Sequence, residues 1–150
     1  MNLVDLLCET AKRQPDSIAI IGPGKNDICS YRDLYELIKS AADTLKAIGI
    51  QPGSCVGLHC PSGQTYIILT YATWLCGACV VPIPVELVPE EKQRIFGDIR
   101  LDTVISPVET INIADPYRQE EPTSVFGNIV AVSVKSVREH PAGFANINAA

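Results

Sequence analysis

The sequence predicts a layered α/β fold with a mostly parallel βαβαβ core, flanking helices and an N-terminal β-hairpin. Between residues 55 and 106, short apolar runs alternate with longer segments of helical periodicity, a pattern typical of strands joined by right-handed crossover helices. The runs are apolar throughout, as expected for parallel strands covered on both faces. Hydrophobic residues make up 47% of the 150 residues, which excludes disorder over the whole length.

The N-terminal residues predict a helix followed by a hairpin. Apolar side chains recur at helical spacing up to Arg13, just before Pro15. Residues 17–21 and 28–30 are short strand-like runs on either side of a turn. The turn contains the sequence GPGK at residues 22–25, but it lacks the Ser or Thr and the upstream glycine of a phosphate-binding loop, so we interpret it as a loop only.

A second helix follows the hairpin. Ser30 and Asp33 have the spacing of a capping box at its start. One apolar stripe runs along it: Leu34, Leu37, Ile38, Ala41, Ala42, Leu45 and Ile48. Gly49 is expected to end the helix, with Ile50 folding back on Leu45 in a Schellman motif.

The predicted core contains three strands and two helices. The strands are residues 55–60, 78–83 and 103–106. Ser62 is expected to cap a helix from about 64 to 76, which should be buried because it is apolar nearly all round. A further helix opens at Pro89, and its apolar side is Ile95, Phe96 and Ile99.

The remaining residues suggest the domain boundary. Residues 107–128 indicate a long connection and residues 128–134 a last strand. We therefore expect one α/β subdomain over residues 1–134 and a linker toward a missing subdomain over residues 135–150.

Charge and hydropathy restrict the function classes. Lys and Arg number 12 against 17 Asp and Glu, a net charge of −5, and no basic cluster is present for nucleic acid. Residues 66–85 are uncharged and about as long as a membrane span, but Gly77, Pro82 and Pro84 interrupt them, so a buried helix and strand is the favoured interpretation. No secretory signal opens the chain, which predicts a cytoplasmic location.

Four cysteines and one histidine each allow both a functional and a structural interpretation. Cys55, Cys60, Cys76 and Cys79 have spacings compatible with a zinc tetrad, and the last two also resemble a redox pair. The favoured interpretation is small buried thiols in a reducing compartment, because they fall inside apolar runs. His59 is interpreted as a core or strand-end histidine, since local spacing places no Cys, Ser or acid beside it.

Several segments together resemble the start of adenylate-forming enzymes, the superfamily of acyl-CoA synthetases, fatty acyl-AMP ligases, luciferases and nonribosomal-peptide adenylation domains. The resemblance covers roughly residues 3–106. Its segments, in order, are QPDSIA at 14–19, SYRDL at 30–34, LKAIGIQPG at 45–53, VGL with PSG at 56–63, WLCGACVVPI at 74–83 and VIS at 104–106. Ser54 stands where the family usually has Asp, and Cys76 and Cys79 stand where small or aliphatic residues are commoner.

The resemblance implies a parent ligase that converts a carboxylate and ATP to acyl-AMP and pyrophosphate, then transfers the acyl group to coenzyme A or a phosphopantetheine carrier. The family's Ser/Thr/Gly-rich ATP loop, its acids for ribose and Mg²⁺ and its C-terminal lysine have no counterpart here; the richest stretches, 22–24 and 62–65, do not match. We therefore expect no catalytic, cofactor-binding or metal-binding residue in this chain and no adenylation by it alone.

Three functions follow as hypotheses. The first is an N-terminal, non-catalytic scaffold fragment of such a ligase, whose partners are the remaining subdomains. The second is a free-standing protein-interaction or assembly module of the same fold. The third is an unrelated α/β protein that binds a ligand at the carboxyl ends of its strands, near Cys60 to Ser62, Pro82 to Pro84 or Ser106. Apolar surface left for a missing subdomain also predicts dimers or higher species.

Overall fold

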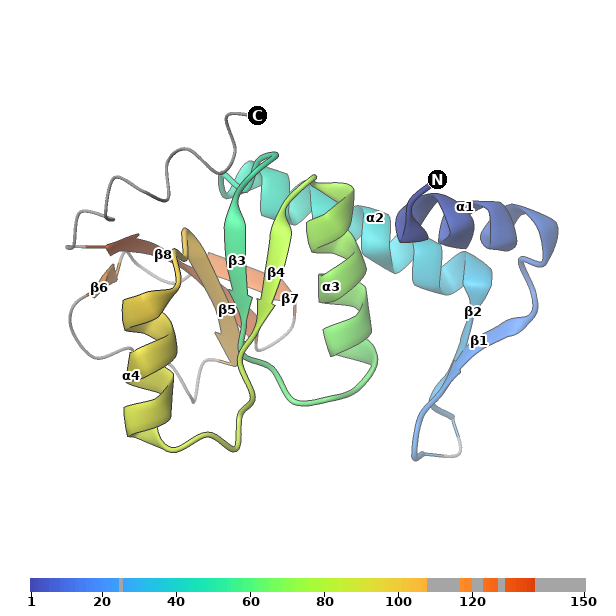
Figure 1. Ribbon diagram of the computed structural model, residues 1–150. Coiled ribbons are helices and arrows are strands. Elements are labelled where there is room, and N and C mark those ends of the chain that lie inside the picture. The colour runs from blue at the N-terminus through green and yellow to red at the C-terminus, as the bar shows by residue number, and fades with distance from the viewer. Residues whose placement is uncertain (25, 108–116, 120–122, 127–128, 137–150) are drawn as a thin grey trace.

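The computed structural model describes residues 1–24 and 26–107 with their side chains, and the backbone of three further strands. The elements, in chain order, are α1 (Leu3–Arg13), β1 (Ile18–Ile21), β2 (Ile28–Ser30), α2 (Tyr31–Ala47), β3 (Cys55–Leu58), α3 (Gln64–Leu75), β4 (Cys79–Pro82), α4 (Pro89–Asp98), β5 (Thr103–Pro107), β6 (Tyr117–Gln119), β7 (Thr123–Phe126) and β8 (Ile129–Ser136). Figure 1 shows the β1–β2 hairpin projecting from a body built around the central sheet.

The central sheet confirms the predicted fold class. Its strand order is β4-β3-β5-β8-β6, with β7 also paired to β8. The three strands β4, β3 and β5 are mutually parallel, whereas β8 runs antiparallel to β5. The first two strands, β1 and β2, form the separate antiparallel hairpin that the sequence predicts.

The C-terminal strands differ from the prediction. The stretch 107–128, expected to be a long connection, contains β6 and β7, so that expectation was wrong. These strands have three and four residues, too few for a periodic pattern to stand out. The last strand spans Ile129–Ser136 rather than 128–134. Residues 137–150, most of the expected linker, lie outside the described residues.

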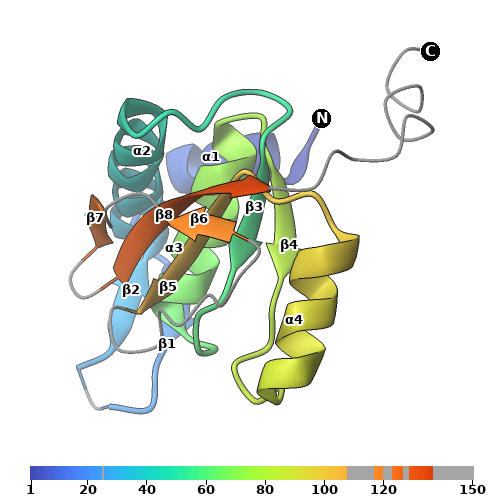
Figure 2. The same ribbon diagram turned by 90° about the vertical axis from the view of Figure 1, so that its left-hand side faces the viewer.

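Helices cover both faces of the parallel strands (Figure 2). Helix α3 connects β3 to β4, and α4 connects β4 to β5. Because the sheet order is β4-β3-β5, these crossovers run in opposite directions across the sheet, and two crossovers of one hand then place their helices on opposite faces. α3 lies on the side of α2, whereas α4 lies on the other side.

Two hydrophobic clusters correspond to the two faces. The larger joins α2 and α3 to side chains of β3 and β5, with Ile38, Leu45 and Leu69 fully buried. The smaller lies beneath α4 and consists of Ile83, Phe96, Leu101 and Val104. Side chains of β3 alternate between the two, so Val56 and Leu58 join the larger cluster while Gly57 lies on the α4 face.

The two ends of α2 can be compared with the predicted N-cap and Schellman motif. Ser30 is the N-cap of α2, since its hydroxyl accepts a hydrogen bond from the Asp33 amide at 3.1 Å. The Asp33 carboxylate accepts from the Ser30 hydroxyl and not from the Ser30 amide, so the second bond of a capping box is not formed. Gly49, with φ of 103°, and Ile50 donate to the carbonyls of Lys46 and Leu45, which confirms the Schellman motif.

Three helix expectations were wrong. Gly63, not Ser62, is the N-cap of α3, and no side chain caps that helix end. α3 is not buried all round, because Trp74 is 37% exposed and packs edge-on against Tyr71 at 5.3 Å between ring centroids. α4 ends at Asp98, so Ile99 follows the helix and is 39% exposed instead of completing its apolar side.

Strand β4 lies at one edge of the sheet formed by the described strands. The amides of Cys79 and Ile83 donate to the carbonyls of Ser54 and Leu58, at 2.8 and 3.0 Å. In a parallel ladder alternate residues bond to the same neighbour, so the nitrogens of Val80 and Pro82 face the open edge. Proline has no N–H, which leaves Val80 as the donor on this side of β4.

The membrane-span alternative was also tested by the structure. Among the described residues, none of the helices is both long enough and apolar enough to cross a bilayer. α3, which begins the uncharged stretch, has 12 residues and ends before Gly77.

Candidate functional site

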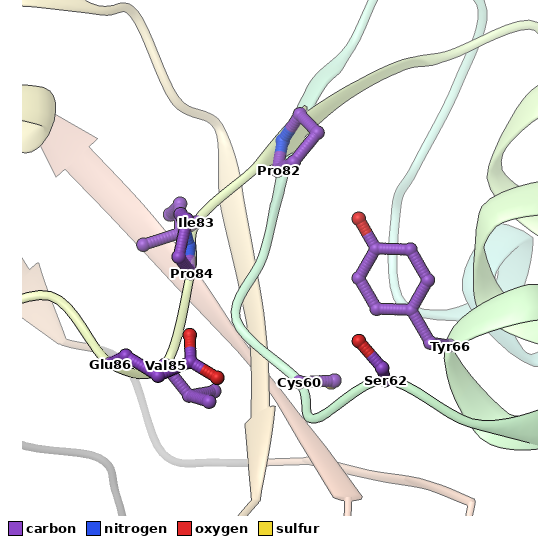
Figure 3. A pocket seen from close by; sticks show the side chains of 8 residues that line it. All are labelled: Cys60, Ser62, Tyr66, Pro82, Ile83, Pro84, Val85 and Glu86. Atoms are coloured by element: carbon purple, nitrogen blue, oxygen red, sulfur yellow. The ribbon is translucent and has the colours of Figure 1, made fainter.

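A pocket lies at the carboxyl ends of β3 and β4, the edge at which open α/β sheets bind ligands (Figure 3). Its volume is about 160 Å³. The lining comes from the loop after β3, the start of α3 and the loop after β4: Cys60, Ser62, Tyr66, Pro82, Ile83, Pro84, Val85 and Glu86. The pocket therefore coincides with two of the three places named for the ligand-binding hypothesis.

The lining of this pocket combines apolar side chains with the hydroxyls of Ser62 and Tyr66 and the carboxylate of Glu86. The Tyr66 ring stands beside Ser62 on one side, and Pro82 to Pro84 form the other side. Burial raises the pKa of the Cys60 thiol to about 11, so this thiol stays protonated at neutral pH and is a weak nucleophile. No Lys or Arg is among the residues that line this pocket. Ligand pockets usually measure about 300 Å³ or more, so this one suits a small group rather than a nucleotide.

Beside the pocket, His59 contacts a residue that local spacing did not reveal. Its Nδ1 lies 3.0 Å from the hydroxyl oxygen of Ser106 in β5, 47 residues away along the chain. His59 is 6% exposed, and its Nε2 has no hydrogen-bond partner among the described residues. Burial, followed by the charge of Lys92, lowers the pKa of His59. The structure thus agrees with the interpretation of a strand-end histidine and adds a serine partner.

The four cysteines of the zinc alternative do not come together. Cys55 and Cys79 lie at the amino ends of β3 and β4, whereas Cys60 lies past the carboxyl end of β3. The Cys76 thiol is buried and donates to the carbonyl oxygen of Ala42 at 3.5 Å. In the part of the chain that the structure describes, no three Cys, His, Asp or Glu side chains are placed to hold a metal ion.

The glycine-rich turn between β1 and β2 is closed by an acid. The Asp27 carboxylate accepts from the Gly24 amide at 3.0 Å, and the Asp27 carbonyl accepts from Gly22 at 2.6 Å. The Gly22 and Gly24 amides are therefore already bonded within the turn. Lys25 lies outside the described residues.

Sequence reasoning missed both side-chain pairs that the sheet assembles. His59 and Ser106 come from β3 and β5, and Cys55 and Cys79 are directly opposed in β3 and β4. The signal that could have identified them is register: once the three strands are taken as parallel neighbours, residues near their ends become partners. Our expectation of no catalytic, cofactor or metal residue stays a prediction.

Comparison with curated proteins shows relatives of two kinds. The long-chain fatty-acid–CoA ligase FadD13 of Mycobacterium tuberculosis is 28% identical over 119 residues, 79% of this chain and 24% of the relative. The nonribosomal peptide synthetase verP of Clonostachys rogersoniana is 31% identical over 111 residues, 71% of this chain and 6% of the relative. The chain thus spans at most about a quarter of the length of either protein.

Solved structures share the fold. The inhibitor-bound N-terminal domain of FACL13 from Mycobacterium tuberculosis aligns with a TM-score of 0.68 and 28% identity, covering 73% of this chain and 28% of that one. The N-terminal subdomain of Klebsiella oxytoca NpsA, in complex with 3-hydroxyanthranilyl-AMSN, aligns with a TM-score of 0.65 at 22% identity, covering 69% and 26%. The second likeness supports the fold alone.

A model of the AMP-binding enzyme family matches residues 7–143, nearly the whole chain. The match includes the sheet, α2 to α4 and the pocket at the carboxyl ends of β3 and β4. The resemblance inferred from residues 3–106 is therefore confirmed, and the chain belongs to the AMP-binding enzyme family.

Proposed function

We propose that this chain is the N-terminal scaffold layer of an AMP-forming ligase and does not itself activate a carboxylate. The observation that carries the proposal is the alignment with the N-terminal domain of FACL13, at 28% identity over about a quarter of that structure. The sheet and its helices would support a larger acyl-activating site, while the nucleotide is bound by other parts of the ligase.

The residues of the pocket and of the glycine-rich turn support the proposal that other parts of the ligase bind the nucleotide. Adenylation requires cations, Mg²⁺ and backbone N–H groups around the ATP phosphates. The pocket of about 160 Å³ has a carboxylate, Glu86, and no cationic side chain in its lining. The glycine-rich turn is already bonded to Asp27. ATP, Mg²⁺ and either coenzyme A or a phosphopantetheine carrier would thus be bound by the parent enzyme elsewhere.

The same proposal assigns partners and location. The remaining subdomains of the ligase would pack on this chain, and the exposed isoleucines of the hairpin, Ile18, Ile21 and Ile28, offer an apolar surface for them. When that surface is uncovered, two chains would associate through it. A net charge of −5 makes nucleic acid an unsuitable partner, and a cytoplasmic location matches the expected supply of ATP.

Pyrophosphate exchange tests the proposal. The chain, ATP, Mg²⁺ and a panel of fatty and amino acids should give exchange no faster than a buffer blank, while FadD13 in the same assay serves as the positive control. Exchange well above the blank would show that this chain activates carboxylates and would refute the scaffold assignment.

A chimera tests the scaffold role directly. Residues 7–107 of this chain would replace the aligned segment of FadD13, and circular dichroism would establish that the chimera folds. A folded chimera should retain exchange with fatty acids, because the replaced layer supplies support rather than catalytic groups. A folded chimera without exchange would show that the replaced segment carries essential chemistry.

A further inference from the structure

We draw no further inference here: the strongest candidate, the buried side-chain cluster of His59 and Ser106 at the carboxyl ends of β3 and β5, carries none because the Nε2 of His59 has no partner in the described part of the chain and nothing there shows what group would bind it.

Discussion

The imidazole Nδ1 of His59 lies 3.0 Å from the hydroxyl oxygen of Ser106, and this contact ties the end of β3 to β5. The His59 amide also donates to the carbonyl of Ile105 at 2.9 Å, so backbone and side chain both extend the pairing of the two strands. Ser106 is 2% exposed and His59 is 6% exposed, so the contact is buried beside the pocket.

His59 should make stability depend on pH. Its pKa in the folded chain is lowered from 6.5 by burial and by Lys92. As the pH falls below 6.5, the unfolded state takes up a proton that the folded imidazole resists, so the free energy of unfolding decreases until the folded pKa is reached. Urea denaturation from about pH 7.5 to about pH 5 should show this loss.

The control for this prediction is His59→Asn, which can keep the bond to Ser106 and does not titrate in this range. Its free energy of unfolding should fall less between the two pH values than that of the unaltered chain. Identical slopes for the unaltered chain and His59→Asn would contradict the assignment.

Gly57 should not tolerate a side chain. A Cβ there would lie 2.9 Å from Cδ1 of Ile83 and 3.3 Å from Cδ1 of Leu101. Gly57→Ala should therefore lower the free energy of unfolding by about 1–3 kcal/mol through overpacking. Gly97→Ala, in α4 with nothing within 4 Å of the added Cβ, should raise it by up to about 1 kcal/mol. Urea midpoints compare the two, and a neutral Gly57→Ala would show that the α4 face is loosely packed.

Ser30 should contribute to stability through the start of α2. Its hydroxyl accepts from the Asp33 amide and donates to the Asp33 carboxylate at 2.8 Å. Ser30→Ala should cost about 1 kcal/mol, measured by thermal or urea unfolding. Ser40→Ala, at an exposed position within the same helix, should be neutral or slightly stabilising. Equal effects at the two positions would indicate that the cap contributes nothing.

The hairpin should promote self-association of the isolated chain. Ile21 is 74% exposed and lies with Ile18 and Ile28 on the projecting hairpin. Light scattering should detect dimers or larger species, and Ile21→Lys should shift them toward monomer. Gln51→Lys adds the same charge at an exposed position away from the hairpin and should not. A chain that is monomeric over a wide concentration range would contradict this prediction.

Local patterns predicted most of the fold. The stripe of α2, its Ser30 cap and the Gly49 motif all depend on residues within a few positions of one another, and all three were confirmed. The errors arose where distant contacts decide the outcome. Trp74 is exposed although most other apolar residues of α3 pack into the larger cluster, and the short strands β6 and β7 exist through pairing with β8.

The sequence predicted where the pocket lies but not which side chains are paired near it. The rule that ligands bind at carboxyl ends of parallel strands located the pocket near Cys60 and Pro82. The partners His59–Ser106 and Cys55–Cys79 depend on strand register, and the sequence alone gave no register for strands separated by a helix. Burial, which sets the pKa of Cys60, likewise depends on packing that no local pattern encodes.

The proline in β4 has a consequence for the behaviour of the chain at high concentration. An open strand edge presents backbone groups that strands of other chains can pair with, which favours aggregation. Here Pro82 withholds one of the amide groups that such recruitment needs, so Val80 is the N–H donor of β4 on this edge, while the carbonyls of Val80 and Pro82 can still accept. Aggregation by strand addition along this edge of the sheet is thereby disfavoured, because an added strand would lack one of its hydrogen bonds.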